Sequence, residues 1–172
     1  MRLPWVWNAR PDEVAAAYPC GAHVPAPSRR MVRAVDVAAG APAVWPWLGQ
    51  LRVAPYSYDL VDNLGRRSPR RLLGLAPPVP GERFLLIFRI TGVVDGVEIT
   101  AAGGNRVTGP YACTYRVLPD GPGRSRLVAR LDMAADTRLR RLLATATAWG
   151  DLVMMRRQLR TLAGLAAGSG RA

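Results

Sequence analysis

The sequence contains no lysine, a single histidine and only two cysteines among its 172 residues. Because His23 is the only imidazole, a Ser-His-Asp or Cys-His catalytic system is not expected. Cys20 and Cys113 lie too far apart in the chain to suggest a disulfide framework. The segment Cys20-Gly-Ala-His23 supplies fewer ligands than a structural zinc site needs. We therefore expect no bound metal.

Sequence motifs for phosphate, dinucleotide and nucleophilic sites are missing as well. The chain has no G-x-x-x-x-G-K-[ST] loop, no G-x-G-x-x-G fingerprint and no G-x-S-x-G elbow. No apolar run reaches the roughly 18 residues of a membrane span, and the N-terminus lacks the apolar stretch of a signal peptide. These observations predict a cytoplasmic protein of one domain that holds no cofactor.

The charge of the chain is one-sided. The formal net charge is +12, and arginine supplies all of the permanent positive side chains. The arginines are scattered, and the one dense group is a basic loop at residues 65–71, Gly-Arg-Arg-Ser-Pro-Arg-Arg. Together with much alanine, glycine and proline, this composition also reflects GC-rich coding DNA. We favour solvated loops and helix faces over a phosphate-binding surface, so nucleic acid is not an expected partner.

The first half of the chain predicts few regular elements. Residues 1–30 are expected to form an irregular arm, because prolines keep much of it extended. Alternating apolar side chains predict a strand over residues 31–38. A helix opened by proline is expected over residues 42–51, and a shorter one over 59–64. Residues 66–81 contain the arginine cluster and several prolines, which indicates a loop.

Residues 82–134 alternate between two kinds of side chain, as strands of an antiparallel sheet do. One run places Phe84, Leu86, Phe88 and Ile90 on the same predicted face. Turns are expected at Asp95-Gly96, Gly103-Gly104-Asn105 and Asp120-Gly-Pro-Gly123.

Asp136 suits the N-cap of one long helix over residues 137–166. The predicted apolar stripe of this helix contains Leu139, Leu142, Leu143, Ala146, Trp149, Val153, Leu159 and Leu162. Residues 168–172 are expected to form a disordered tail. The single folded domain is therefore predicted to span residues 31–167.

These elements predict an α+β fold. A curved antiparallel sheet of six or seven strands would wrap around the long C-terminal helix, with two short helices after the first strand. A single helix cannot fill a strongly bent sheet, so we expect a cavity between the two. The short helices would close one end of this cavity.

Three separated pieces of sequence carry a family resemblance. They are Val44-Trp-Pro-Trp-Leu48 with Gln50, Tyr56-Ser-Tyr-Asp59 with Asp62-Asn63, and Met154-Met-Arg-Arg-Gln-Leu159. In this order, over most of residues 31–165, the chain resembles the helix-grip superfamily, also called START-like, polyketide cyclase/dehydrase-like or SRPBCC. The resemblance implies the helix-grip fold and an apolar or aromatic ligand in its cavity. Some members cyclise or dehydrate polyketides, and others carry lipids or hormones.

The chain departs from this pattern at one place. Relatives often have a Gly-Trp step before the first tyrosine of the second motif, where this sequence has Ala54-Pro55. The departure removes an aromatic side chain from the expected mouth of the cavity. It therefore bears on which ligands enter.

The candidate ligand-binding residues are mostly aromatic. We predict that the ligand contacts Trp45, Tyr56, Tyr58, Phe88, Tyr111, Tyr115, Trp149 and Val153. Tyr111 and Tyr115 share one face of a strand, where they offer stacking surfaces and hydroxyl groups. Core packing explains these side chains equally well.

No catalytic residue is assigned, and the candidates are Asp59, Tyr111 and Arg89. Asp59 shares one helix face with Asp62, where an apolar mouth would raise the pKa of a carboxyl group. Helix capping explains Asp59 as well. Arg89 and Glu98 are expected on neighbouring strands, and we favour an exposed pair over an inward polar anchor.

The leading functional hypothesis is a monomeric or homodimeric protein that holds an apolar or aromatic molecule, such as a lipid or a polyketide-like compound. The alternative is an enzyme of the polyketide cyclase or dehydratase type. That alternative requires an ionisable side chain with a displaced pKa beside the ligand space. A further alternative is binding to an anionic membrane or nucleic acid through the basic loop at residues 65–71, together with Trp5 and Trp7.

Overall fold

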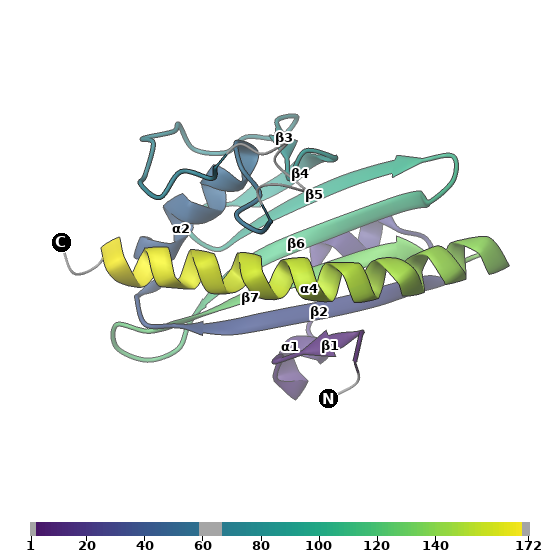
Figure 1. Ribbon diagram of the computed structural model, residues 1–172, viewed down its shortest axis with the longest axis horizontal. Helices are drawn as coiled ribbons and strands as arrows, with labels where there is room; N and C mark the ends of the chain where they lie inside the picture. Colours follow the sequence, from purple (N-terminus) through teal and green to yellow (C-terminus); the bar gives the residue numbers. More distant parts are fainter. Residues whose placement is uncertain (1–2, 59–66, 170–172) are drawn as a thin grey trace.

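The computed structural model describes residues 3–58 and 67–169, which form a seven-stranded sheet crossed by one long helix. Figure 1 shows helix α4 (Arg138–Ser169) lying along the sheet, with helix α2 (Ala41–Gly49) near its C-terminal end. The other elements are β1 (Val6–Trp7), α1 (Pro11–Ala15), η1 (Pro19–His23), β2 (Ser28–Val37), η2 (Gln50–Arg52), β3 (Arg83–Phe84), β4 (Phe88–Val94), β5 (Glu98–Asn105), β6 (Gly109–Pro119) and β7 (Ser125–Ala134).

The strands follow the order β1-β2-β7-β6-β5-β4-β3 across the sheet. All neighbouring pairs are antiparallel except β1 and β2, which run parallel. Two short helices, α2 and η2, follow β2, the first long strand. This arrangement confirms the predicted helix-grip fold. The helix expected at residues 59–64 lies outside the described residues.

Both faces of the sheet are covered. On β2, Val35 and Val37 belong to the core beneath α4, whereas Val32 and Ala34 point to the opposite face. That back face is packed by N-terminal residues, including Tyr18, Cys20 and Val24. Residues 3–27 therefore contribute to a second apolar layer behind the sheet. Within the described residues, no helix is long and apolar enough to cross a bilayer.

The predicted apolar stripe of α4 is wrong in its N-terminal half. The inward face is formed by Ala144, Ala148, Leu152, Met155, Leu159, Leu162 and Ala166, while Leu139, Leu142, Trp149 and Val153 are exposed. Ala144 and Ala148 pack closely against Met31 and Met133 of the sheet. Small side chains permit this close approach, and a search for large apolar residues overlooks them.

The segment from Phe84 to Ile90 is a tight hairpin rather than one continuous strand. Phe84 of β3 pairs with Phe88 of β4, so the chain reverses between them. Leu85 and Leu86 have φ values of 48° and 65°. Leu86 is consequently exposed instead of sharing the buried face. Left-handed backbone at consecutive leucines is uncommon and costs conformational energy.

The glycine turn expected at residues 103–105 is also displaced. Gly103 pairs with Tyr111 inside β5, and the chain turns at residues 106–108 instead. A Cβ atom at Gly103 would lie 2.5 Å from Tyr111 Cε2 and 2.7 Å from the Ile87 carbonyl oxygen. Glycine is thus required here by close approach of its neighbours and not by a turn.

Candidate functional site

A cavity of about 360 Å³ lies between the sheet and α4. We refer to it as the main cavity. It is lined by Pro55, Ser57, Leu85, Leu86, Ile87, Phe88, Cys113, Tyr115, Arg130, Leu131, Thr147, Gly150, Asp151, Met154, Met155 and Gln158. Leu86, Ile87 and Gly150 are exposed, so they mark its mouth. The walls are predominantly apolar, as in most small-molecule sites.

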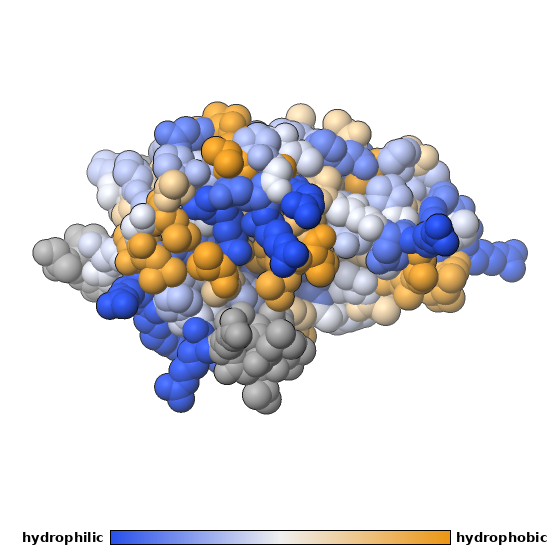
Figure 2. All heavy atoms as spheres, turned by 90° about the horizontal axis from the view of Figure 1, so that it is seen from above, coloured by the Kyte–Doolittle hydropathy of each residue, from blue (hydrophilic) through white to orange (hydrophobic). Residues whose placement is uncertain are grey.

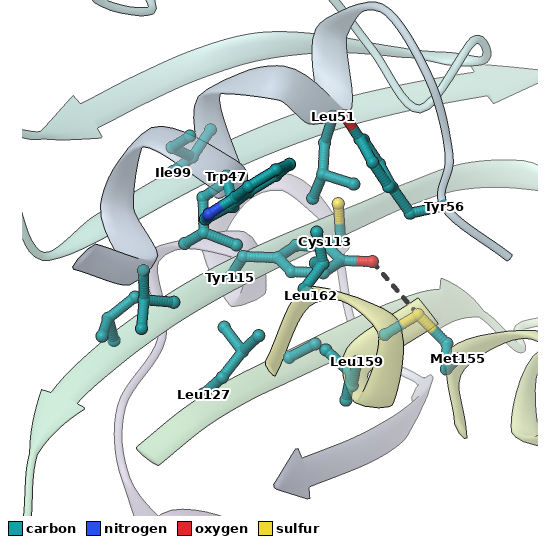
Figure 3. Close-up of a cluster of buried hydrophobic side chains, with 14 of the residues drawn as sticks. Trp47, Leu51, Tyr56, Ile99, Cys113, Tyr115, Leu127, Met155, Leu159 and Leu162 are labelled. Carbon is teal, nitrogen blue, oxygen red and sulfur yellow. Dashed lines mark hydrogen bonds between the residues drawn. The ribbon is translucent and has the colours of Figure 1, made fainter. Parts of the chain in front are cut away.

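Tyr115 is held at the inner wall by α4. Figure 3 shows its ring among buried apolar side chains, with the hydroxyl directed toward Met155. This hydroxyl donates a hydrogen bond of 2.6 Å to Gln158 Oε1 and lies 3.1 Å from Met155 Sδ. Gln158 Nε2 in turn donates to the Pro55 carbonyl at 2.5 Å. Burial raises the pKa of Tyr115, so its hydroxyl remains protonated.

Asp151 is the ionisable carboxyl group of the main cavity, and it is the only acidic residue of α4. Burial raises its pKa to about 6, although the positive charge of Arg33 opposes this shift. Among the described residues, Asp151 Oδ2 lacks a hydrogen-bond partner of good geometry. A buried acceptor of this kind is costly unless a water or a ligand satisfies it.

Arg33 supports Asp151 from the sheet. Its side chain is only 1% exposed, and its Nη2 atom lies 3.3 Å from Asp151 Oδ2. Arg33 also donates to the carbonyls of Trp5 at 2.7 Å and Ala148 at 3.3 Å. Burial lowers the pKa of Arg33, while the charge of Asp151 opposes that change. The pair therefore joins β2 to α4 beside the cavity.

The rim of the mouth depends on Tyr111. The rings of Phe88 and Tyr111 meet edge to face with centroids 5.1 Å apart. The Tyr111 hydroxyl lies 3.4 Å from the carbonyl oxygen of Ile87 and donates to it. Tyr111 thus packs under the hairpin of residues 84–90, which we call the rim hairpin, instead of lining the main cavity. Gly103 has no side chain, and this absence leaves room for the Tyr111 ring.

The structure brings only two of the predicted ligand-binding residues, Phe88 and Tyr115, into the lining of the main cavity. Tyr56 is 2% exposed and packs edge to face on Trp47 in the core. Trp45 lines a different cavity between α2 and the loop after it.

The remaining three lie farther out. Tyr58 and Val153 line an arginine-rich surface cleft along α4, where Arg157 stacks over the Tyr58 ring at 4.6 Å. Trp149 is 54% exposed on the outer face of the helix.

The catalytic candidates are likewise dispersed. Arg89 is exposed on β4 and donates to the Gly81 carbonyl at 3.0 Å. Glu98 pairs with Arg116 at 2.6 Å, so the proposed partnership of Arg89 with Glu98 is wrong. The register explains this, because Arg89 faces Ala102 on β5 whereas Glu98 faces Val94 on β4. Asp59 lies outside the described residues.

Three polar residues of the site were not anticipated from the sequence: Arg33, Asp151 and Gln158. One indication was available, because Asp151 is the only acid in a 32-residue helix and follows a glycine in an apolar stretch. Arg33 gave no indication among so many arginines. Gln158 belongs to the third family motif, but its contact with Tyr115 depends on how α4 lies on the sheet.

Solved structures of low sequence identity share this architecture. A protein from Thermobifida fusca, solved by solution NMR, has a TM-score of 0.56 at 19% identity, covering 81% of this chain and 93% of that one. Zhui aromatase/cyclase from Streptomyces sp. R1128 has a TM-score of 0.50 at 15% identity, covering 84% and 97%. Truncated norcoclaurine synthase from Thalictrum flavum has a TM-score of 0.52 at 13% identity, covering 80% and 92%.

These likenesses show that the chain has the helix-grip, START-like fold. No protein-family model matches the sequence, and no curated protein matches it. The chemistry of the site therefore rests on its own residues.

Proposed function

We propose that the protein binds an apolar or aromatic small molecule, such as a lipid or a polyketide-like compound, in the main cavity. The observation that carries this proposal is the cavity of about 360 Å³, with apolar walls and few polar groups. Burial of apolar ligand surface would supply most of the affinity, at roughly 25 cal/mol per Å² before the costs of association. The shared fold of an aromatase/cyclase and a norcoclaurine synthase is compatible with such a ligand.

The polar groups of the cavity suggest one further property of the ligand. Asp151 Oδ2 is buried without a well-aligned donor among the described residues, and it lines the cavity together with Tyr115. A ligand hydroxyl, phenol or amine that donates a hydrogen bond to this oxygen would satisfy it. We therefore propose a mostly apolar ligand that carries one donor group.

Gly150 offers a direct test, because it lines the cavity and a Cβ atom added there would meet nothing within 4 Å. Replacing a helix-interior glycine by alanine stabilises a helix by about 1 kcal/mol. We expect Gly150→Leu to fold at least as stably as the wild type but to bind a hydrophobic dye at least about tenfold more weakly, since about 1.4 kcal/mol of lost contact suffices for that factor.

Gly150→Ala is the matched control, which should gain stability and keep dye binding. Native mass spectrometry of the purified protein would show whether a small molecule accompanies it. Unchanged dye affinity in Gly150→Leu would contradict binding in the main cavity.

A second candidate function is proton transfer during cyclisation of a poly-β-ketone. Its supporting observation is that the pKa of Asp151 is raised to about 6 inside the cavity, where a carboxylate near neutral pH is an effective base. Asp151 would take the proton from a carbon between two carbonyls, the enolate would attack a ketone carbon, and the resulting alkoxide would recover the proton. Asp151→Asn should then abolish turnover while the variant still binds the substrate. If the wild-type protein binds the substrate but does not turn it over, this function is excluded.

A further inference from the structure

The outer face of α4 carries an exposed apolar stripe. Leu139, Leu142, Trp149 and Val153 recur every three or four residues apart from one longer step, which Ala146 fills, so they lie on one side of the helix. Their exposed fractions are 57%, 70%, 54% and 54% in that order. We call these five residues the outer stripe. Scattered exposed apolar residues need no explanation, but an aligned row of large ones indicates a contact surface.

The outer stripe borders the mouth of the main cavity. Gly150 lines the mouth, directly follows Trp149 and lies within one helical turn of Val153. Across the mouth, the rim hairpin presents Leu86 and Ile87, which are 55% and 65% exposed. Figure 2, which views the molecule from above relative to Figure 1, shows apolar patches interspersed with hydrophilic ones on that face. Apolar side chains therefore flank the opening on two sides.

The charge around the outer stripe favours an anionic occupant. Exposed arginines lie on the same helix at both ends of the stripe, Arg138 and Arg141 at its start and Arg156, Arg157 and Arg160 after its end. Asp151, the only acid of α4, lines the main cavity. The chain as a whole has a formal net charge of +12. A second copy of this face would bring arginines against arginines, whereas anionic lipid headgroups would pair with them.

We propose that the outer stripe and the rim hairpin dock on an anionic bilayer and place the cavity mouth at its surface. Trp149, Leu86 and Ile87 would enter the interfacial layer while the arginines contact lipid phosphates. An apolar ligand would then pass between the bilayer and the cavity with little exposure to water. The docking proposal depends only on this surface. The proposal that a ligand passes between bilayer and cavity rests on the proposed function. The surface differs from the basic loop at residues 65–71.

Flotation with phosphatidylcholine vesicles, with and without phosphatidylglycerol, tests the docking step. We expect the wild type to float with the anionic vesicles and to be released as salt screens the charges. The double variant Trp149→Glu/Val153→Glu should bind at least about tenfold more weakly, and each change of Arg138 or Arg141 to Gln should weaken binding about fivefold. Val94→Glu is the matched control, because Val94 is 52% exposed at the distant β4–β5 turn.

Three results would overturn the proposal. One is absence of wild-type binding to the anionic vesicles, and another is unchanged binding of the double variant. The third is a wild-type dimer in sedimentation that Trp149→Glu dissociates, since the stripe would then be a subunit interface.

Dye uptake in buffer by the double variant separates the two proposals. Normal uptake with lost flotation supports docking through the stripe, whereas no uptake by any form rejects the ligand cavity and leaves the flotation result to decide docking.

Discussion

At the scale of single residues, Asp151 sets the chemical character of the site. A carboxyl group in an apolar cavity loses hydration that one partly aligned arginine does not replace. Its pKa consequently rises, whereas the pKa values of the partly exposed Asp120 and the exposed Asp136 are lowered by hydrogen bonds from Arg10 and Arg140. Lowering the pH therefore increases the contribution of Asp151 to the free energy of unfolding and decreases the contributions of Asp120 and Asp136.

The raised pKa predicts a specific dependence of stability on pH. Between its ordinary value of 3.8 and about 6, Asp151 holds a proton more tightly in the folded state. Its contribution to the free energy of unfolding is therefore greatest below about pH 4 and falls by roughly 3 kcal/mol as the pH rises through 6. We expect urea unfolding of the wild type and Asp151→Asn to differ by an amount that changes in this window. Asp95→Asn is the control at an exposed turn, and a difference that is constant with pH would contradict the assignment.

Gly103 illustrates a steric requirement at the rim of the cavity. A methyl group there would press against the Tyr111 ring and the Ile87 carbonyl. We expect Gly103→Ala to lower the free energy of unfolding by roughly 1–3 kcal/mol and to weaken dye binding, because the rim hairpin has to move. Thermal unfolding and dye titration measure both effects. Gly92→Ala, where the added methyl group meets nothing within 4 Å, should show neither.

At the scale of elements, Gln50 joins the short helices to the loop that follows them. Its side chain is 1% exposed, and its Nε2 atom donates to the Tyr56 hydroxyl at 2.5 Å. The same amide accepts from the Leu73 backbone N–H at 2.5 Å and donates to the Arg71 carbonyl at 3.3 Å. Two of the residues that carry the family resemblance, Gln50 and Tyr56, thus hold the short helices and the following loop together.

This arrangement predicts a local loss of order when Gln50 is replaced. Gln50→Leu would remove the acceptor of the Leu73 N–H and the amide that donates to the Tyr56 hydroxyl, and the cost is roughly 2–4 kcal/mol. Hydrogen exchange at the Leu73 amide should accelerate more than exchange in β6. Val53→Ser, at a neighbouring exposed position, should leave both stability and exchange nearly unchanged. Equal exchange at Leu73 in both variants would reject the proposed role.

At the scale of the whole molecule, the N-terminal residues belong to the folded body. Arg126 of β7 makes two hydrogen bonds of 2.8 Å to the Glu13 carboxylate, and both side chains are buried. The Tyr18 hydroxyl donates to the Glu13 carbonyl at 2.9 Å. These contacts tie α1 to the back of the sheet, behind the surface that α4 covers.

The contact predicts that this segment and the sheet unfold together. Among the described residues, Glu13→Ala leaves the buried Arg126 guanidinium with the half-exposed Asp36 as its one acidic partner, beside the Asn8 carbonyl, so we expect the free energy of unfolding to fall by about 3 kcal/mol. Asp12→Ala, at an exposed neighbour, should change it by less than about 0.5 kcal/mol. Chemical unfolding combined with limited proteolysis would measure this. Cleavage of the segment without loss of sheet stability would show that it is an independent arm.

The sequence by itself determined the order of the elements and the class of fold. Alternation along β6 and β7, turn residues at Asp95-Gly96 and a long acid-poor C-terminal segment are local patterns, and local patterns depend on neighbours along the chain. They sufficed to predict the sheet, the long helix and an apolar cavity between them. Tyr115 and Phe88 were assigned to that cavity because alternation also determines which side chains share a strand face.

Only the tertiary structure decided which side of α4 faces the sheet and what the cavity contains. Alanine at positions 144 and 148 is buried because the helix lies close to the sheet there, and the larger Leu142 and Trp149 are left outside. The same packing brings Asp151 to Arg33 and Gln158 to Tyr115, from elements far apart in the sequence. Contacts of this kind depend on the curvature of the sheet and the position of the helix, which no local pattern encodes.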